Sequence, residues 1–389
     1  MPLDPELASL KKTLKEIPFP SRFAVELCAE CNLACSMCHH PQMKRPKGVM
    51  PFELWKRCAD QVAARSPRTE VWFSFCGEPL LEPDLLLDMI AYGRSVGLRS
   101  ININTNGMLL TPDLDDRILE SGIHRIVFGV DGFSKSVFES IRVKADRDVV
   151  YRNVTRLLAR RDELGGGPEI NVQFVVMDSN EHEVEPFREF WKPKGATLKI
   201  RNQLSWGGKF ESSLCVPDDE RIPCPWAMTM MHVFWDGRVP RCPGDTEGDV
   251  NEEAGNAWHE PLDVLWGRLG KFRNLHMAGR YDELPERCHT CQDWMTGAAV
   301  REHPEPENAL IDLASRPTGR RAAVRSGTMR SEVDVVHEAA GFHETVVPRV
   351  SAEPTTDGSG GSRERAPSGF TPDGGGAGDS PSREGALVR

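Results

Sequence analysis

The sequence lacks any long hydrophobic run. None of its 389 residues falls in an apolar stretch of about 18 residues, and no charged-then-apolar leader opens the chain, so we expect neither a membrane span nor a secretion signal. It also lacks a dense basic cluster, and its formal net charge is −10, which argues against a nucleic-acid partner on electrostatic grounds. These absences predict a cytoplasmic protein.

Cysteine is missing from the last part of the chain. All eleven cysteines lie between Cys28 and Cys291, and tryptophan also disappears after Trp294. Glycine, serine, proline and mixed charges dominate residues 298–389, and such a segment cannot bury enough apolar surface to offset its chain entropy, so we expect a disordered tail there. In a reducing compartment, cysteines gathered in the remaining part indicate metal binding or catalysis rather than disulfides.

Three of these cysteines occur on one short segment near the N-terminus. Cys31, Cys35 and Cys38 have the spacing C-x3-C-x2-C. Three thiolates on one loop can hold three corners of a cubane iron–sulfur cluster and leave the fourth iron open. A zinc site completed by His39 or His40 is the alternative.

Strand-like and helix-like runs alternate from Arg22 to about Gln203. The predicted strands are Phe23–Leu27, Val71–Phe75, Ser100–Asn104, Arg125–Val130, Glu169–Val176 and Thr197–Asn202. The predicted helices are Pro51–Arg65, Pro83–Val96, Pro112–Ser121, Asp148–Leu164 and Glu183–Trp191. Because parallel strands need a crossover, this alternation predicts parallel βα units. The expected fold class is α/β, a partial (βα)6 barrel over residues 21–203 that follows an N-terminal segment, 1–20.

Two predicted strands place polar side chains on a single face. Asparagines alternate with apolar residues from Ile101 to Asn106, and Lys199, Arg201 and Gln203 share a face because strand side chains alternate with period two. An open, curved sheet whose concave side holds a polar ligand would explain this pattern. A solvated sheet edge is the alternative for Lys199 and Arg201.

Residues 204–297 differ from the barrel region because they contain fewer long helices and more clustered cysteines. The Asp-Gly pair at 236–237 predicts a hairpin, and residues 262–274 have the pattern of an amphipathic helix. We therefore expect a small cysteine-rich α+β module.

Four cysteines of this module can form a second site. They are Cys224, Cys242, Cys288 and Cys291. One C-x2-C pair with two distant cysteines can close a four-thiolate site around zinc or a second iron–sulfur cluster, and the spacing alone does not separate these metals.

Turn motifs follow three of the predicted strands. Cys76, Gly77, Glu78 and Pro79 come after the second strand, where a carboxylate would stand at the mouth of the sheet. The third strand ends in Asn104-Thr105-Asn106-Gly107 and the fourth in Val130-Asp131-Gly132, which taken alone are ordinary Asn-Gly and Asp-Gly turns.

The cysteine spacing and these motifs, in this order, resemble the radical S-adenosylmethionine (radical SAM) superfamily. The resemblance implies a 4Fe–4S cluster on Cys31, Cys35 and Cys38, whose open iron binds S-adenosylmethionine (SAM) and whose electron generates a 5'-deoxyadenosyl radical. It further implies that the Gly77-Glu78-Pro79 turn engages the methionine amino group, with Cys76 standing where the family has glycine.

The same resemblance assigns further residues to SAM. Asn104, Asn106 and Asp131 are expected to line its adenosine and methionine portions. Met37 occupies a position that is often aromatic in the family, and its flexible thioether can pack on the adenine instead.

The surroundings of the four later cysteines resemble the auxiliary-cluster module called twitch, a shortened SPASM domain. The matching segments are Pro223-Cys224-Pro225-Trp226, Arg241-Cys242-Pro243, Gly255-Asn256 and Cys288-x2-Cys291-x2-Trp294. This resemblance implies one auxiliary cluster, a second 4Fe–4S centre.

This layout most resembles antibiotic-pathway enzymes that act on sugars and aminocyclitols, such as 2-deoxy-scyllo-inosamine dehydrogenase. It implies a small hydroxylated substrate, a flavodoxin- or ferredoxin-type electron donor, and oxidation of a carbinol as the leading reaction, with Arg201 or a nearby group managing the proton. Epimerisation would need a thiol such as Cys76 or Cys215 to return hydrogen, and decarboxylation of a glycosyluronic acid would use Lys199 and Arg201 as cations.

Two other classes remain open from the sequence. Many SPASM relatives modify a ribosomal peptide, but they usually carry a winged-helix module before the barrel, and the residues ahead of the first predicted strand are too few for one. A zinc-binding scaffold without catalysis would contain zinc in place of iron and would not cleave SAM.

Overall fold

The computed structural model describes residues 17–210, 221–249, 251, 253–294 and 300–302. The chain divides into one compact unit over residues 1–344 and another over residues 345–389, and only the first contains described residues. Most of the N-terminal segment and of the predicted tail therefore lies outside the described residues, as does the loop that contains Cys215.

A single large sheet forms the centre of this unit. Its strand order is β10-β6-β5-β4-β3-β2-β1-β7, and every neighbouring pair is parallel except β10 with β6. The strands are β1 (Arg22–Val25), β2 (Glu70–Phe73), β3 (Ile101–Thr105), β4 (Arg125–Gly129), β5 (Glu169–Val176), β6 (Thr197–Asn202), β7 (Met230–Val233) and β10 (Val300–Glu302). The predicted α/β fold class is confirmed.

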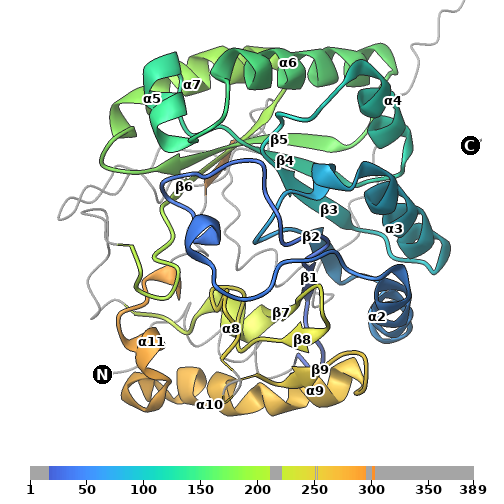
Figure 1. Cartoon of the computed structure of the whole chain (residues 1–389), viewed down its shortest axis with the longest axis vertical. Coiled ribbons are helices and arrows are strands. Elements are labelled where there is room, and N and C mark those ends of the chain that lie inside the picture. The colour runs from blue at the N-terminus through green and yellow to red at the C-terminus, as the bar shows by residue number, and fades with distance from the viewer. Residues whose placement is uncertain (1–16, 211–220, 250, 252, 295–299, 303–389) are drawn as a thin grey trace, which may run out of the picture. The chain divides into compact units, whose positions relative to one another are not determined.

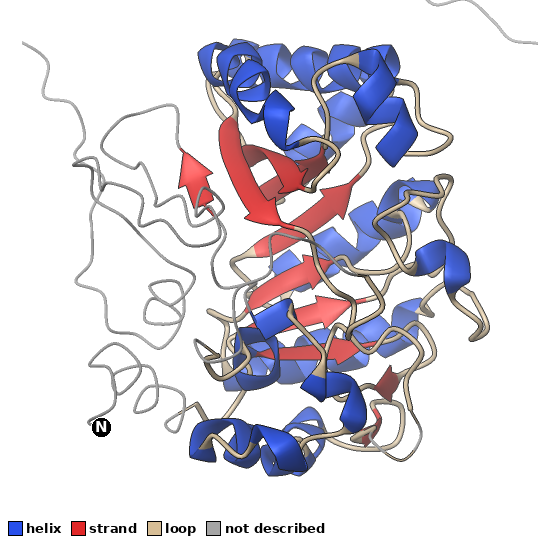
Figure 2. Cartoon of the chain, turned by 90° about the vertical axis from the view of Figure 1, so that its left-hand side faces the viewer, coloured by secondary structure: helices blue, strands red, loops and turns tan. Residues whose placement is uncertain are grey.

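Helices follow the strands and cover one face of the sheet (Figure 1). They are α2 (Phe52–Arg65), α3 (Pro83–Ser95), α4 (Pro112–Glu120), α5 (Lys135–Ile141), α6 (Arg147–Glu163) and α7 (Val184–Trp191). The later part of the chain adds α8 (Pro225–Thr229), the short strands β8 (Arg238–Val239) and β9 (Gly255–Asn256), and the helices α9 (Leu262–Arg268), α10 (Gly270–Ala278) and α11 (Glu286–His289). Figure 2 shows the strands stacked one above another, with helices above, behind and below them.

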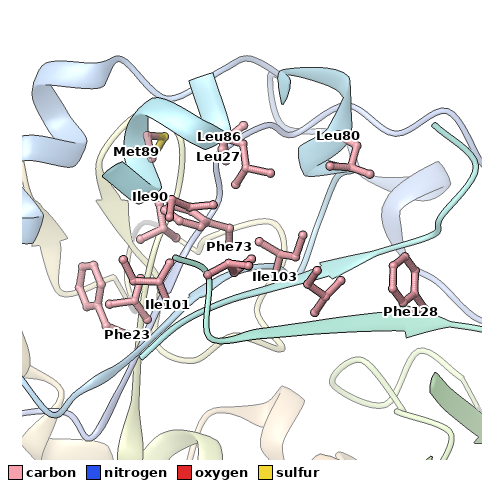
Figure 3. Packing of buried hydrophobic residues seen from close by; sticks show 14 of the residues in the cluster. Phe23, Leu27, Phe73, Leu80, Leu86, Met89, Ile90, Ile101, Ile103 and Phe128 are labelled. Atoms are coloured by element: carbon pink, nitrogen blue, oxygen red, sulfur yellow. The ribbon is translucent and has the colours of Figure 1, made fainter. Parts of the chain in front are cut away.

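Alternation along the strands separates an apolar face from a polar one. Phe23, Phe73, Ile103 and Phe128 point toward the helices and are fully buried in the main core, where they pack against residues such as Met89 (Figure 3). The intervening strand residues lie on the opposite face because successive side chains alternate. All seven parallel strands contribute to this inner face, which carries both polar and apolar side chains and forms the wall of the cavity described below.

The predicted strands and helices of residues 21–203 agree with the structure within about two residues at most ends. The short helix α5 was not predicted. Its seven residues follow the N-cap Ser134, whose hydroxyl accepts the Val137 N–H, and they are too few to show a clear helical period.

The prediction of one helix over residues 262–274 was wrong in one respect. The structure has two helices there, α9 and α10, which are separated at Leu269. Gly267 and Gly270 flank the break, and glycine is a poor helix former.

The turn of the hairpin predicted at residues 236–237 is present, because the Phe234 N–H donates to the Arg238 carbonyl at 2.9 Å. Its strands do not pair with each other, however. β7 extends the large sheet in parallel with β1, whereas β8 pairs with β9. The sequence region assigned to the cysteine-rich module thus supplies a seventh parallel strand to the sheet.

Candidate functional site

A cavity of about 240 Å³ lies against the inner face of the sheet. Each of the seven parallel strands contributes to its wall: Arg22, Trp72, Asn104, Val127, Gln173, Lys199 and Met230 come from β1 to β7 in turn. The three thiols of Cys31, Cys35 and Cys38 line the same cavity. The structure therefore brings the cysteine segment and the predicted polar face together in one site.

The cysteine segment is an irregular loop held by backbone hydrogen bonds. The Ala34 N–H donates to the Val143 carbonyl at 3.0 Å, and the Ser36 N–H donates to the Ile141 carbonyl at 2.8 Å. The Trp206 indole N–H donates to the Met37 carbonyl at 3.0 Å. Contacts from distant parts of the chain thus fix the loop that presents the thiols.

The surroundings of these thiols disfavour their ionised form in the absence of a bound cation. Burial, with a smaller contribution from neighbouring thiols, raises the pKa of Cys31 to about 12 and that of Cys38 to about 11. Soft metal centres bind thiolates, so binding at this loop releases protons and its affinity rises with pH.

The Gly77-Glu78 turn is packed directly against the start of the cysteine loop. Gly77 has a φ of +107°, and a Cβ at this position would lie 1.8 Å from the Cys28 carbonyl oxygen, so only glycine fits. The Glu78 N–H donates to the Glu30 carbonyl at 2.8 Å. Pro79 is buried and starts a short 3-10 helix, Pro79–Leu81, that carries the chain away from the cavity.

The Glu78 carboxylate joins the ends of two neighbouring strands. It accepts the Thr105 hydroxyl at 2.7 Å and the N–H groups of Asn106 at 2.8 Å and Leu80 at 3.0 Å. Burial raises the pKa of Glu78, while these hydrogen bonds lower it. The carboxylate lines the cavity beside the cysteine loop, where a ligand's ammonium group could contact it.

Asn104 and Asn106 both line the cavity. The Asn106 amide donates to the side-chain oxygen of Asn32 in the cysteine loop at 2.8 Å. Among the described residues, the buried Oδ1 of Asn104 has no hydrogen-bond partner.

Asp131 does not line the cavity but lies behind it. Its carboxylate accepts the Val175 N–H at 2.8 Å and pairs with the Arg142 guanidinium, whose Nε and Nη2 lie 2.8 and 2.5 Å from Oδ2. The structure therefore places Asp131 as the residue that positions Arg142.

Arg142 is a cavity residue that the sequence analysis did not name. It lines the cavity, and its charge opposes the burial that raises the Cys35 pKa. Gly129 makes room for it, since a Cβ there would lie 1.9 Å from Nη2. No local spacing signals this arginine, which lies eleven positions after Asp131 and follows the helix that the sequence did not predict.

The other predicted site residues fall into three groups. Met37, Lys199 and Arg201 line the cavity. Cys76 is buried in an apolar cluster and is not among the described residues that line the cavity, and burial raises its pKa well above the usual range. Cys215 lies outside the described residues.

A second, smaller cavity of about 30 Å³ is lined by all four later cysteines: Cys224, Cys242, Cys288 and Cys291. Burial raises the pKa of all four thiols, to about 12 for Cys224 and about 11 for Cys288. Trp226 lines this cavity and the first one, so its side chain is shared by the walls of both.

Asp293 holds the second set of cysteines to the rest of the chain. Its Oδ1 accepts the Ser205 N–H at 2.6 Å and the Trp206 N–H at 3.2 Å, and its Oδ2 accepts the Gly207 N–H at 3.0 Å. Because Trp206 also donates to the Met37 carbonyl, this carboxylate links the segment after Cys291 to the first cysteine loop. The sequence carries no local signal for this role.

Within the described residues, no group of three or more His, Cys, Asp or Glu side chains has the arrangement of ligands around a single metal ion. A cubane cluster binds its thiolates at separate iron corners, so its ligands stand farther apart than those of one ion. The same part of the chain contains no helix both long and apolar enough to cross a lipid bilayer.

Comparison with known proteins gives a family match for the part of the chain that contains the first site. Residues 25–190 match the family model described as the radical SAM superfamily. These residues form a radical SAM domain. The family implies a 4Fe–4S cluster and SAM, and the fit is good, since three soft thiols, the Glu78 carboxylate and the Arg142 guanidinium meet at one end of the cavity.

Several curated relatives are similar to part of this chain. A GTP 3',8-cyclase of Synechococcus sp. (strain CC9902) is 34% identical over 213 residues, which cover 51% of this chain and 61% of the relative. A tungsten-containing aldehyde ferredoxin oxidoreductase cofactor-modifying protein of Pyrococcus furiosus is 27% identical over 159 residues, 40% of this chain and 44% of the relative. The first three curated relatives are matched over only 44%, 34% and 55% of their lengths.

A solved structure extends the similarity of fold beyond this domain. Streptococcus suis SuiB, bound to its precursor peptide SuiA, aligns with a TM-score of 0.53 and 14% identity over 74% of this chain and 73% of SuiB. At this identity the likeness concerns the fold alone.

Proposed function

We propose that the chain is a radical SAM enzyme with one auxiliary 4Fe–4S cluster, held by Cys224, Cys242, Cys288 and Cys291 in a twitch-type module. The observation that carries this proposal is the second cavity, which gathers all four later thiols although they span residues 224–291. Soft thiolates select iron–sulfur centres or zinc. Trp226 lines both this cavity and the first.

The residues of the first site have distinct tasks in this proposal. Cys31, Cys35 and Cys38 would hold the cluster that supplies reductive SAM cleavage, leaving one iron open to the cofactor. Glu78 would accept hydrogen bonds from the methionine ammonium group, and Arg142 would face its carboxylate. Met37 packs with Ile141, Val175 and Met177 in a small apolar cluster that suits the adenine ring.

The substrate would be a small hydroxylated molecule bound on the polar inner face, such as a sugar, a nucleoside sugar or an aminocyclitol. Ser74, Asn104 and Gln173 line the cavity and can exchange hydrogen bonds with hydroxyl groups. Loss of a hydrogen atom from a carbinol carbon leaves a radical that must lose one electron and one proton to become a carbonyl. The auxiliary cluster would accept the electron, which makes oxidation the leading outcome.

Epimerisation and decarboxylation are the alternatives, and placement of the candidate residues bears on both. Cys76, one candidate hydrogen donor for epimerisation, is buried away from the cavity lining, whereas Lys199 and Arg201, the candidate cations for a uronic acid, line it. Product analysis separates the three outcomes by redox change and by loss of carbon dioxide.

Anaerobic reconstitution followed by iron, sulfide and zinc analysis tests the proposal. We expect about eight irons per chain, no zinc, and formation of 5'-deoxyadenosine from SAM under dithionite. About four irons with one zinc would refute the auxiliary cluster, and a chain without 5'-deoxyadenosine formation would refute the radical chemistry.

A further inference from the structure

Thr105, the last residue of β3, lines the cavity beside Glu78. Its side chain is buried, and the sequence analysis named its neighbours Asn104 and Asn106 but not Thr105 itself. The Thr105 hydroxyl donates to Oε1 of Glu78 at 2.7 Å, the shortest of the hydrogen bonds described above for this carboxylate. The other two donors, Asn106 and Leu80, use backbone N–H groups, so Thr105 supplies the side-chain donor.

The Glu78 carboxylate keeps an acceptor position for a ligand. An ionised carboxylate offers about four lone pairs, two on each oxygen. Oε1 accepts from both Thr105 and Leu80, whereas Oε2 accepts the Asn106 N–H. One lone pair of Oε2 therefore stays available in the cavity that Glu78 lines.

Hydrogen bonds are the main compensation for burying this carboxylate. Burial raises the pKa of Glu78, and the bonds from Asn106, Thr105 and Leu80 lower it, with a smaller contribution from the Arg142 charge. A buried carboxylate stays ionised only when such contacts offset its desolvation. Loss of one donor therefore favours the neutral carboxyl group, which attracts an ammonium group less strongly.

The turn after β3 holds the Thr105 hydroxyl in place. Its Oγ1 accepts the Gly107 N–H at 3.2 Å, which leaves the hydroxyl proton to point toward Glu78. The Asn106 side chain in the same turn donates to Asn32 of the cysteine loop at 2.8 Å. One short turn thus connects the hydroxyl donor to Glu78 and to the loop that carries the first three cysteines.

From this arrangement we propose that Thr105 is a positioning residue for SAM, whose hydroxyl orients Glu78 so that the remaining lone pair of Oε2 accepts a hydrogen bond from the methionine ammonium group. The inference rests on the proposed function, because it takes SAM as a ligand of this cavity. It requires Thr105 to affect only those ligands that carry the ammonium group.

Calorimetric titration of the anaerobically reconstituted full-length protein with SAM and with 5'-methylthioadenosine tests the inference. 5'-Methylthioadenosine retains the adenosine and the sulfur atom but lacks the ammonium group. Thr105→Val should bind SAM about tenfold more weakly than the wild type and bind 5'-methylthioadenosine equally well. Thr105→Ser keeps the hydroxyl and should restore SAM affinity. Thr155→Val is the matched control, since Thr155 lies on α6 and is not among the described residues that line the cavity.

A double-mutant cycle with Glu78→Gln separates action through Glu78 from a general loss of structure. In the Glu78→Gln background, Thr105→Val should weaken SAM binding less than it does in the wild type, because the carboxylate that the hydroxyl orients is already absent.

Wild-type SAM affinity in Thr105→Val, an equal loss of affinity for SAM and 5'-methylthioadenosine, no recovery in Thr105→Ser, or additive effects in the cycle would each overturn the inference. Iron content and 5'-deoxyadenosine formation are measured on the same samples. A wild type that neither binds SAM nor forms 5'-deoxyadenosine would refute the proposed radical chemistry. Normal cleavage by the wild type with unaltered SAM binding by Thr105→Val would refute only the role of Thr105.

Discussion

The two cysteine sets reach their sites in different ways. Cys31, Cys35 and Cys38 lie within eight residues on one loop, so the sequence alone places them together. Cys224, Cys242, Cys288 and Cys291 come from the start of α8, from the segment after β8, and from α11 and the residues after it. The first set is a local motif that the fold presents to the cavity, whereas the second exists only when distant segments pack around it.

The difference lies in what each site needs from the rest of the chain. The first loop depends on close backbone contacts with its neighbours, such as those of Gly77 with Cys28 and of Ser36 with Ile141. The second set depends on single side chains that join remote segments, above all Asp293. The variants below test this contrast, from the largest expected effect to the smallest.

Removing one cysteine from each set should separate their chemical roles. Cys31→Ala should abolish 5'-deoxyadenosine formation, because the cluster that supplies SAM cleavage loses a ligand. Cys288→Ala should retain uncoupled cleavage while the iron content falls toward about four per chain. Chromatographic measurement of 5'-deoxyadenosine with iron analysis checks both. Wild-type cleavage by Cys31→Ala would contradict the assignment of the first loop.

The close packing around the first loop predicts that Gly77→Ala greatly lowers the free energy of unfolding. The added Cβ would meet the Cys28 carbonyl oxygen, and the residue also has a positive φ. We expect the free energy of unfolding in urea to fall by about 3 kcal/mol or more. Gly97→Ala is a matched control, since Gly97 has a similar φ of +99° but no neighbouring atom within 4 Å of an added Cβ, and it should cost about 1 kcal/mol. If both variants lost the same unfolding free energy, close packing at Gly77 would not explain the effect of Gly77→Ala.

Asp293→Asn tests the connection of the second set. An amide cannot accept from all the N–H groups of Ser205, Trp206 and Gly207, so we expect a loss of about 2 kcal/mol in unfolding free energy together with a lower auxiliary iron content. Asp282→Asn changes the charge equally at an exposed position and should leave both unchanged. Wild-type stability and iron content in Asp293→Asn would show that this carboxylate does not hold the second set of cysteines in place.

His232 connects the two regions, because β7 belongs to the module by sequence and to the large sheet by pairing. Its ring is buried between Phe75 and Phe234, and burial, followed by the nearby Arg45 charge, lowers its pKa to about 3. Below the ordinary histidine pKa the unfolded chain binds a proton that the folded chain does not, so stability falls as the pH drops from about 6.5 toward 3.

His232→Phe should remove this dependence. Between about pH 6.5 and 5.5 the wild type should lose about 1 kcal/mol more unfolding free energy than the variant, as measured by urea denaturation at each pH. His182→Gln, at an exposed position, should follow the wild type. Parallel pH curves for wild type and His232→Phe would contradict the burial argument.

The strands and the grouping of the first three cysteines could be predicted from the sequence because their signals are local. Period-two alternation, as in Ile101 to Asn106, and the cysteine spacing both depend on neighbours within a few residues. Sequence reasoning missed Arg142 and Asp293, whose tasks arise from tertiary contacts with Asp131 and with residues 205–207. Asp131 was expected to contact the cofactor because its turn matched the family, and only the packing behind Gly129 shows which side chain it meets.

The most direct test of the account is an iron count on the triple variant Cys31→Ala/Cys35→Ala/Cys38→Ala after anaerobic reconstitution. The account predicts about four irons per chain, with the electron paramagnetic resonance spectrum of a reduced 4Fe–4S cluster and no 5'-deoxyadenosine. A folded triple variant that binds no iron, or binds one zinc instead, would contradict the claim that the four later cysteines hold a second cluster.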